Sequence, residues 1–231
     1  MIVNFQTHCI LLNGPPRSGK DSFADAVCGV DEVAKGHVVV RSSFGQALRQ
    51  VIRPFTCAVG APQHPTEWQK WYDENKDRDM HEVLDVPRTI RSLRHCMIEL
   101  SENFVKENFG QNIYGRLVLR HWLNLVKHTH EKHGNDEGIE DLKFTLVVTD
   151  LGFEDEGKVM FDFFRPHELT VVQLHREGCN FDKDSRSYVT LGAGEWAFNN
   201  DGMTLDEWHN RSRAVVQGIW ENRENEQRRI N

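Results

Sequence analysis

The segment Gly14-Pro15-Pro16-Arg17-Ser18-Gly19-Lys20-Asp21 stands between a short apolar run, Cys9–Leu12, and a stretch with apolar residues at helical spacing, Asp21–Val27. The apolar run is typical of a buried strand, and the spacing that follows indicates a helix. Between a strand and a helix, the pattern G-x-x-x-x-G-K lets backbone N–H groups ring a phosphate. We therefore predict a phosphate-binding loop here, with an ordinary glycine turn as the alternative.

The predicted loop assigns a role to each of its polar side chains. Lys20 is expected to neutralise the outer phosphates of a nucleotide, and Arg17 to touch them from the loop; exposed cations are the alternative. Asp21 stands where Ser or Thr usually binds Mg²⁺, and Ser22 comes one position later. We expect both residues to help hold Mg²⁺, Asp21 through a water molecule. The alternative for Asp21 is that its negative charge only stabilises the helix N-terminus.

Apolar periodicity predicts an alternation of strands and helices along the chain. The predicted strands are 9–12, 37–40, 144–148, 169–174 and 196–198. The predicted helices are 21–27, 44–52, 88–126 with a break near Gly110, 154–164 and 204–224. For the last helix, Thr204 is expected to be the N-cap and Glu207 its capping-box partner. Residues 55–87 read as irregular because of their prolines, and 128–141 as a polar linker. Alternating strands and helices favour an α/β fold, a parallel sheet sandwiched by helices, in one domain over 1–231.

Composition limits the class of protein. The chain has 231 residues, 39% apolar and 27% charged, which suits a globular domain with a sizeable core. We see no apolar run near the roughly 18 residues of a membrane span and no signal peptide. Five cysteines without a C-x-x-C spacing indicate reduced thiols in the cytoplasm. A net charge of −7 argues against non-specific binding of nucleic acid but leaves a local basic groove open.

Three further side chains are candidates for catalysis. Asp150 ends the strand 144–148, on the side where open α/β sheets bind ligands, so it is expected to bind Mg²⁺ or act as a base. Its alternative is a structural partner for loop amides. Arg176 and Arg186 flank a turn-rich, lid-like segment, 176–194, and are expected to clamp the transferring phosphoryl group. Solvated loop charge is their alternative.

The helical region 43–127 is expected to bind the phosphoryl acceptor. Its arginines Arg49, Arg88 and Arg94 are the candidates for holding an acceptor phosphate, against a solvated helix face. Trp68, Trp71 and Tyr72 are candidates for stacking on a base, but their helical spacing favours core packing.

Four segments resemble a known family. Asn13–Ser22 is similar to the R-[SA]-G-K-D-[TS] loop of phage-type deoxynucleoside monophosphate kinases, which are P-loop kinases related to thymidylate and adenylate kinases. Ser43–Arg49, Val147–Glu156 and Asn200–Glu207 resemble its S-F-A-x-P-[LI]-K, V-x-D-x-R-F-x-N-E and N-D-G-[ST]-L-x-E-L motifs in the same order. The resemblance implies a P-loop NTPase fold, ATP and Mg²⁺ as cofactors, and a cytoplasmic location, in the host if the protein is phage-encoded.

The resemblance also implies that Asn200 and Gly202 shape the adenine pocket through their backbone, against a simple turn. The resemblance is weaker in the segments that are expected to hold the phosphoryl acceptor. Gly152 stands where the family has an arginine, and the segments Ile98–Asn103 and Asp184–Val189 lack its Q-x-x-G-T-[DE] and D-x-H-x-x-E patterns.

Three functions therefore stay open. The first is transfer of phosphate from ATP to a deoxynucleoside monophosphate. The second is phosphorylation of the hydroxymethyl group of 5-hydroxymethyluracil in phage DNA, an acceptor with no terminal monophosphate for an arginine to bind. The third is a non-catalytic nucleotide-binding module. The sequence leaves the oligomeric state, including a homodimer, open.

Overall fold

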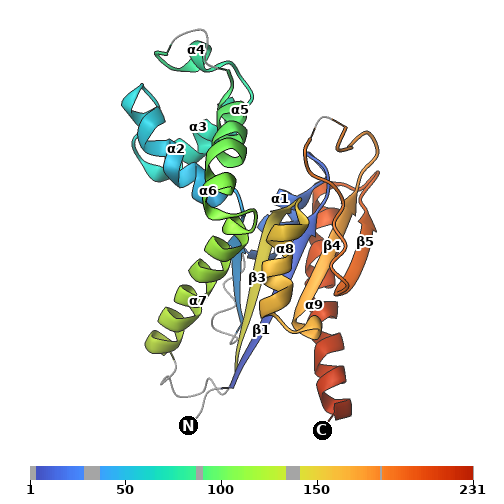
Figure 1. Ribbon diagram of the computed structural model, residues 1–231. Helices are drawn as coiled ribbons and strands as arrows, with labels where there is room; N and C mark the ends of the chain where they lie inside the picture. The colour runs from blue at the N-terminus through green and yellow to red at the C-terminus, as the bar shows by residue number, and fades with distance from the viewer. Residues whose placement is uncertain (1–3, 29–36, 87–90, 134–140, 183, 231) are drawn as a thin grey trace. The chain divides into compact units, whose positions relative to one another are not determined.

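The structure is a computed structural model that describes residues 4–28, 37–86, 91–133, 141–182 and 184–230 (Figure 1). The chain divides into two compact units. One comprises Met1–Phe44 with Gly115–Asn231, and the other is the continuous segment Gly45–Tyr114. The second unit lies within the helical region predicted for 43–127.

The first unit is built on a parallel sheet. Its five strands among the described residues follow the order β2-β3-β1-β4-β5, and every neighbouring pair is parallel. The strands are β1 (Asn4–Asn13), β2 (His37–Ser42), β3 (Asp141–Leu151), β4 (Leu169–His175) and β5 (Gly194–Asn199). Each contains one of the predicted strands, so the predicted parallel sheet is confirmed.

Helices cover both faces of this sheet (Figure 1). On one face, α1 (Lys20–Cys28) and α9 (Leu205–Ile230) pack over Ile10 and Leu12 of β1. On the other face lie α8 (Glu154–Phe163) and α7 (Ile113–His133), where the Trp122 ring is 6.0 Å from that of Phe144. The short 3₁₀ helix η3 (Pro166–Glu168) leads into β4. Burial on both faces explains why β1, β3 and β4 read as continuous apolar runs.

The regular structure described in the second unit consists of helices, apart from one isolated bridge between Asp79 and Ser92. It contains α2 (Gln46–Ala58), α3 (Pro65–Asn75), α4 (Met80–Val83), α5 (Leu93–Leu100), the π-helix η2 (Ser101–Lys106) and α6 (Glu107–Phe109). Gly110 follows α6 with φ of 94°, a left-handed conformation that costs glycine little, so the break predicted there is confirmed.

Three secondary-structure predictions were wrong. Helix α2 runs through Pro54 instead of ending before it, and its last turn is held by the Trp68 indole, which donates to Thr56 Oγ1 at 2.8 Å. That tertiary contact offsets the hydrogen bond that proline removes. Residues 55–87 are largely helical, because Pro65 opens α3 at its first turn, where proline is tolerated. The predicted linker 128–141 is shortened because α7 continues through His133.

Other expectations on the described residues hold. Thr204 and Glu207 form the predicted capping box before α9, with Thr204 N donating to Glu207 Oε2 at 2.8 Å. All five cysteines are free thiols. None of the helices that the structure describes combines the length and the apolarity needed to cross a membrane.

Candidate phosphate-binding site

The predicted loop lies at the carboxyl edge of the sheet, directly after β1. Strand β1 pairs with β3 on one side and β4 on the other. In open parallel sheets, ligands bind in the crevice beyond the strand ends where neighbouring connections diverge. The end of β1 is such a position, so the loop occupies the part of the sheet where a ligand is expected.

The loop has an unusual backbone path. Arg17 has φ of 66° and Gly19 has φ of 95°, so two residues near the helix start are left-handed. A left-handed arginine is strained by about 1–3 kcal/mol, and such strain gathers where backbone N–H groups are aimed at a ligand. Gly14 is close-packed, because a Cβ there would lie 2.7 Å from the Leu174 carbonyl oxygen and from Ser18 Oγ.

Lys20 begins α1 and turns its side chain back into the loop. Its Nζ donates to the carbonyl oxygens of Gly14 at 2.7 Å and Pro15 at 2.6 Å, and it lies 3.5 Å from Ser18 Oγ. The residue is 8% exposed. The ammonium group is thus held at the centre of the loop by backbone oxygens.

This environment lowers the pKa of Lys20. Burial, and then the positive charge of Arg186, lowers the pKa of Lys20 from 10.5 to about 8, while Asp21, Asp150 and Asp184 oppose the shift. An ammonium with a lowered pKa is short of negative charge, and an anion entering the loop would supply it.

Two residues close to the start of α9, Asn200 and Trp208, donate hydrogen bonds to the backbone of the loop. The Asn200 side chain donates to the Ser18 carbonyl oxygen at 2.9 Å, and the Trp208 indole donates to the Gly19 carbonyl oxygen at 3.2 Å. A Cβ at Gly19 would lie 2.6 Å from Asn200 Nδ2. Both the φ angle and this contact therefore require glycine at position 19.

The turn after Asn200 borders an open groove of about 560 Å³. Its lining comes from this turn and the first half of α9: Asp201, Gly202, Met203, Glu207, Asn210, Arg211 and Ala214. Gly202 has φ of 71° and so permits the turn. The sequence predicted backbone contacts to adenine at Asn200 and Gly202; the structure gives the Asn200 side chain a supporting role and places Gly202 in a groove.

Two of the three predicted Mg²⁺ ligands, Asp21 and Asp150, have protein partners. Asp21 is exposed and pairs with Arg41 at 2.5 Å. Asp150 Oδ1 accepts a hydrogen bond from the Phe44 backbone at 2.7 Å, which is the structural role considered above as its alternative. Ser22 is half-buried in the first turn of α1.

Within the described ranges, no three His, Cys, Asp or Glu side chains form a group that could hold a metal ion. Magnesium bound to a nucleotide takes most of its oxygens from phosphates and water, and needs only one or two from the protein. Ser22 and Asp150 carry oxygens of the kind that Mg²⁺ prefers, so the residue types are compatible with Mg²⁺ that arrives with a nucleotide.

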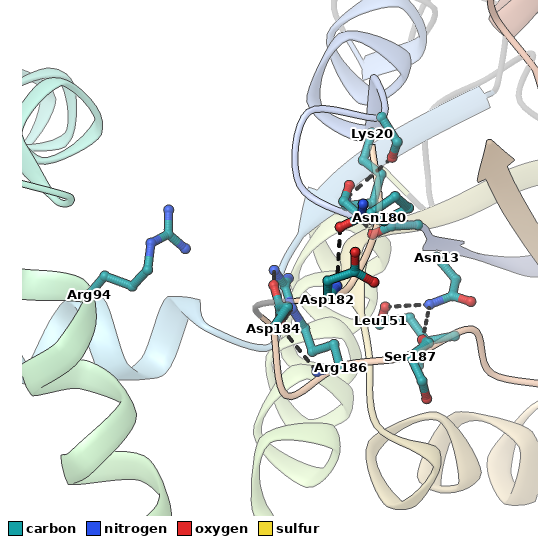
Figure 2. Close-up of polar contacts among 12 residues, drawn as sticks. Asn13, Lys20, Arg94, Leu151, Asn180, Asp182, Asp184, Arg186 and Ser187 are labelled. Atoms are coloured by element: carbon teal, nitrogen blue, oxygen red, sulfur yellow. Dashed lines mark hydrogen bonds and ion pairs between the residues drawn. The ribbon is translucent and has the colours of Figure 1, made fainter. Parts of the chain in front are cut away.

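The segment 176–194 contributes both predicted arginines to this edge. Arg176 Nη1 donates to the Arg17 carbonyl oxygen at 3.4 Å, so it lies against the loop. Arg186 is paired with Asp184, its Nε donating to Asp184 Oδ1 at 2.8 Å (Figure 2). The positive charge of Arg186 contributes to the lowered pKa of Lys20, so the two cations lie within electrostatic range of each other.

The helical unit holds the predicted acceptor arginines. Arg94 is exposed and forms a two-bond ion pair with Asp77, one bond being 3.1 Å. Arg49 and Arg94 both act on the Tyr72 hydroxyl, whose pKa is raised by burial despite them. Arg88 lies outside the described residues.

The aromatic residues of this unit pack internally. Trp68 and Tyr72 are buried, and their rings stack at 5.2 Å. Core packing, the favoured alternative, is therefore confirmed for these two residues.

Asn13, Trp208 and Asp184 were given no role by the sequence analysis. Asn13 is a fully buried amide at the end of β1 that joins three chain segments. A polar residue closing an apolar run was the one local signal for it. Trp208 acts through a contact with Gly19, which is far from it in the sequence. Asp184 pairs with Arg186 only two residues later, but its charge alone did not distinguish it from other loop carboxylates.

A scan against models of known protein families found no match, and a search of curated proteins found no similar sequence. Among solved structures, the chain is similar to an unliganded sugar kinase from Janibacter sp. HTCC2649, with 9% identity and a TM-score of 0.37. The alignment covers 91% of this chain and 95% of that one. Similarity at this level carries no argument about function.

Proposed function

We propose that the chain is an ATP-dependent phosphotransferase that converts a deoxynucleoside monophosphate to the diphosphate. One observation carries the proposal: Lys20 Nζ is held on the carbonyl oxygens of a strained loop between a parallel strand and a helix. A buried ammonium facing a helix N-terminus favours a polyanion such as the phosphates of ATP.

Phosphoryl transfer requires mainly positioning and stabilisation of negative charge. In the proposed reaction, the bond between the γ-phosphorus and the β–γ bridging oxygen of ATP breaks. A new bond forms to an acceptor oxygen, and ADP leaves. Lys20 would stabilise the charge on the outer phosphates from within the loop. Arg176 and Arg186 would add cations from the segment 176–194.

Mg²⁺, when bound with ATP, would neutralise charge on the phosphates, with Ser22 and Asp150 as its ligands from the protein and Asp21 acting through water. Asp150 has a second possible task, because an alcohol acceptor must lose a proton whereas a phosphate acceptor need not. Its contact with the Phe44 backbone would hold the carboxylate in place for either task.

Gly152 favours a second candidate acceptor, the hydroxymethyl group of 5-hydroxymethyluracil in DNA. The position where related kinases have an arginine carries no side chain, and Gly152 is buried. An acceptor without a terminal monophosphate would not need that arginine. The acceptor arginines Arg49 and Arg94 would then contact the DNA backbone instead of a free nucleotide.

A transfer assay tests both candidates. The protein is incubated with ATP labelled in the γ-phosphate, Mg²⁺ and either a set of deoxynucleoside monophosphates or duplex DNA containing 5-hydroxymethyluracil. Label in deoxynucleoside diphosphates alone supports the first candidate and eliminates the second; label in DNA alone does the reverse. The absence of transfer together with an absence of ATP binding contradicts phosphotransferase activity, whereas ATP binding alone leaves the third function, a non-catalytic nucleotide-binding module.

An Asp150→Asn variant adds a chemical discrimination. If the acceptor is an alcohol and Asp150 is its base, the variant should lose about 10²–10⁴-fold in rate. A phosphate acceptor should be affected much less, since no proton has to be removed.

A further inference from the structure

Gly152 leaves a space that another side chain occupies. A Cβ at this position would overlap Cγ and Cδ of Arg186 and would lie 2.7 Å from its Cβ. Any side chain at 152 would therefore displace the stem of Arg186. Gly152 is not among the glycines with positive φ, so its backbone conformation would accept other residues. The requirement for glycine here comes from Arg186.

The backbone around Arg186 is fixed to the ends of β1 and β3. Asn13 Nδ2 donates to the carbonyl oxygens of Leu151 at 2.8 Å and Ser187 at 3.0 Å, and Asn13 Oδ1 accepts from Val189 N at 2.8 Å (Figure 2). Ser187 N also donates to the Gly152 carbonyl oxygen at 3.3 Å. We call residues 184–189 the strap. These bonds attach it to the sheet.

The guanidinium group of Arg186 is oriented by the strap itself. Asp184 accepts from Arg186 Nε at 2.8 Å and from its Nη2, and the side chains of Asp184 and Arg186 are only 17% and 21% exposed. A planar guanidinium matches a phosphate as well as it matches a carboxylate. Asp184 thus fixes the orientation of the guanidinium group.

We propose that Gly152 is a positioning residue. Because it has no side chain, the stem of Arg186 can lie against it, on a strap that Asn13 attaches to the sheet. Arg186 in this position is the arginine that contacts the nucleotide phosphates together with Lys20. This inference rests on the proposed function, and it accounts for Gly152 whichever acceptor is used. The strap is then a fixed arm that carries Arg186, and the arginine does not depend on closure of residues 184–189 to reach its place.

The test is a double-mutant cycle. The affinity for Mg²⁺–ATP is measured by calorimetry for each variant, in the absence of acceptor. Gly152→Ala and Arg186→Gly should each weaken ATP binding by about ten- to hundredfold, the range for losing a hydrogen bond to a charged group. The double variant should bind no more weakly than Arg186→Gly, because the methyl group added at position 152 then has no arginine stem to displace. In a transfer assay, Gly152→Ala should follow Arg186→Gly in both kcat and KM for ATP.

Gly157→Ala is the matched control. Gly157 is also buried, and a Cβ there would lie 2.9 Å from the apolar side chains of Leu151 and Leu191. It should lower the melting temperature without changing ATP affinity. If Gly152→Ala does not fold, the double variant must fold again, since the clash would be gone; failure to do so overturns the inference.

The remaining outcomes separate the inference from the function. Unchanged ATP affinity in a folded Gly152→Ala variant, or losses that multiply in the double variant, overturn the role of Gly152 and leave the phosphotransferase intact. A wild-type protein that does not bind ATP overturns the proposed function and this inference with it.

Discussion

The predicted phosphate loop and the helical unit Gly45–Tyr114 hold their basic side chains in different ways. Lys20 is 8% exposed and fixed by backbone oxygens, whereas Arg94 is an exposed residue paired with the side chain of Asp77. A cation held by the backbone has one position, set by the path of the chain. An exposed ion pair contributes about 0–1 kcal/mol and can be exchanged for a ligand anion at little cost.

The difference suggests that the two sides of the proposed reaction are specified differently. The nucleotide side is built into the backbone of one short loop and its supports. The acceptor side depends on surface side chains that neighbouring residues can replace, so the identity of the acceptor is less constrained by the fold.

Removal of the Lys20 ammonium should give the largest effect. Lys20→Ala is expected to reduce phosphoryl transfer by at least about 10²–10³-fold, because one preorganised charge on the transferring group is lost. The rate is measured with γ-labelled ATP. Lys158→Ala is the control, since Lys158 is exposed and pairs with Asp162 at 3.1 Å on α8. Equal activity of both variants would show that Lys20 is not part of the site.

A side chain at Gly19 should disturb the loop itself. Gly19→Ala must adopt φ of 95° and place a Cβ 2.6 Å from Asn200 Nδ2. We expect a loss of about 1–3 kcal/mol in the free energy of unfolding, together with weaker ATP binding. Thermal unfolding and calorimetry measure the two effects.

Gly178→Ala is the matched control for this variant. Gly178 has φ of 73° with nothing within 4 Å of the added Cβ among the described atoms, so backbone strain is the only cost there. If the two variants lose the same stability and affinity, the contact with Asn200 has no energetic role.

ATP affinity should depend on pH through Lys20. The phosphates bind the ammonium form, and burial followed by Arg186 lowers the pKa of Lys20 to about 8. The protein should therefore bind ATP with full affinity below pH 8. Above pH 8 the affinity should fall by up to about tenfold per pH unit, because binding then requires the uptake of one proton. Calorimetry in buffers of different ionisation enthalpy measures this uptake.

The contribution of Lys20 to folding stability depends on pH in the opposite direction to ATP affinity, between about pH 8 and 10.5. Because its pKa is lower in the folded protein than in the unfolded chain, the unfolded chain binds more protons between about pH 8 and 10.5. Its contribution to stability therefore rises with pH while ATP affinity falls. An affinity that is constant from pH 7 to 9 would contradict the proposed role of the ammonium.

The smallest effect is expected in the helical unit. Arg94→Ala should raise the KM for the acceptor about fivefold and leave the KM for ATP unchanged, since an exposed ionic contact contributes little. Arg78→Ala is the control, because Arg78 is half-exposed and pairs with Glu82 at 3.5 Å. A large loss of activity in Arg94→Ala would mean that the acceptor side is as rigidly specified as the loop.

Elements with local signals were predictable. The five strands and the break at Gly110 followed from apolar runs and glycine, and the Thr204–Glu207 cap from its spacing. The helical unit was less predictable. Pro54 lies inside α2, whose last turn is bonded to Trp68, and the prolines of 55–87 concealed α3. Propensity is a weak guide wherever tertiary contacts compete with it.

The sequence by itself determined the loop, the parallel sheet and the position of Lys20, because glycine spacing and apolar periodicity act between neighbours in the chain. Only the tertiary structure decided that Asn13 anchors the strap, that Asn200 and Trp208 support the loop, and that Arg186 fills the space at Gly152. These contacts join residues far apart along the chain. Their energies depend on packing and hydrogen-bond geometry that arise only after the strands have assembled.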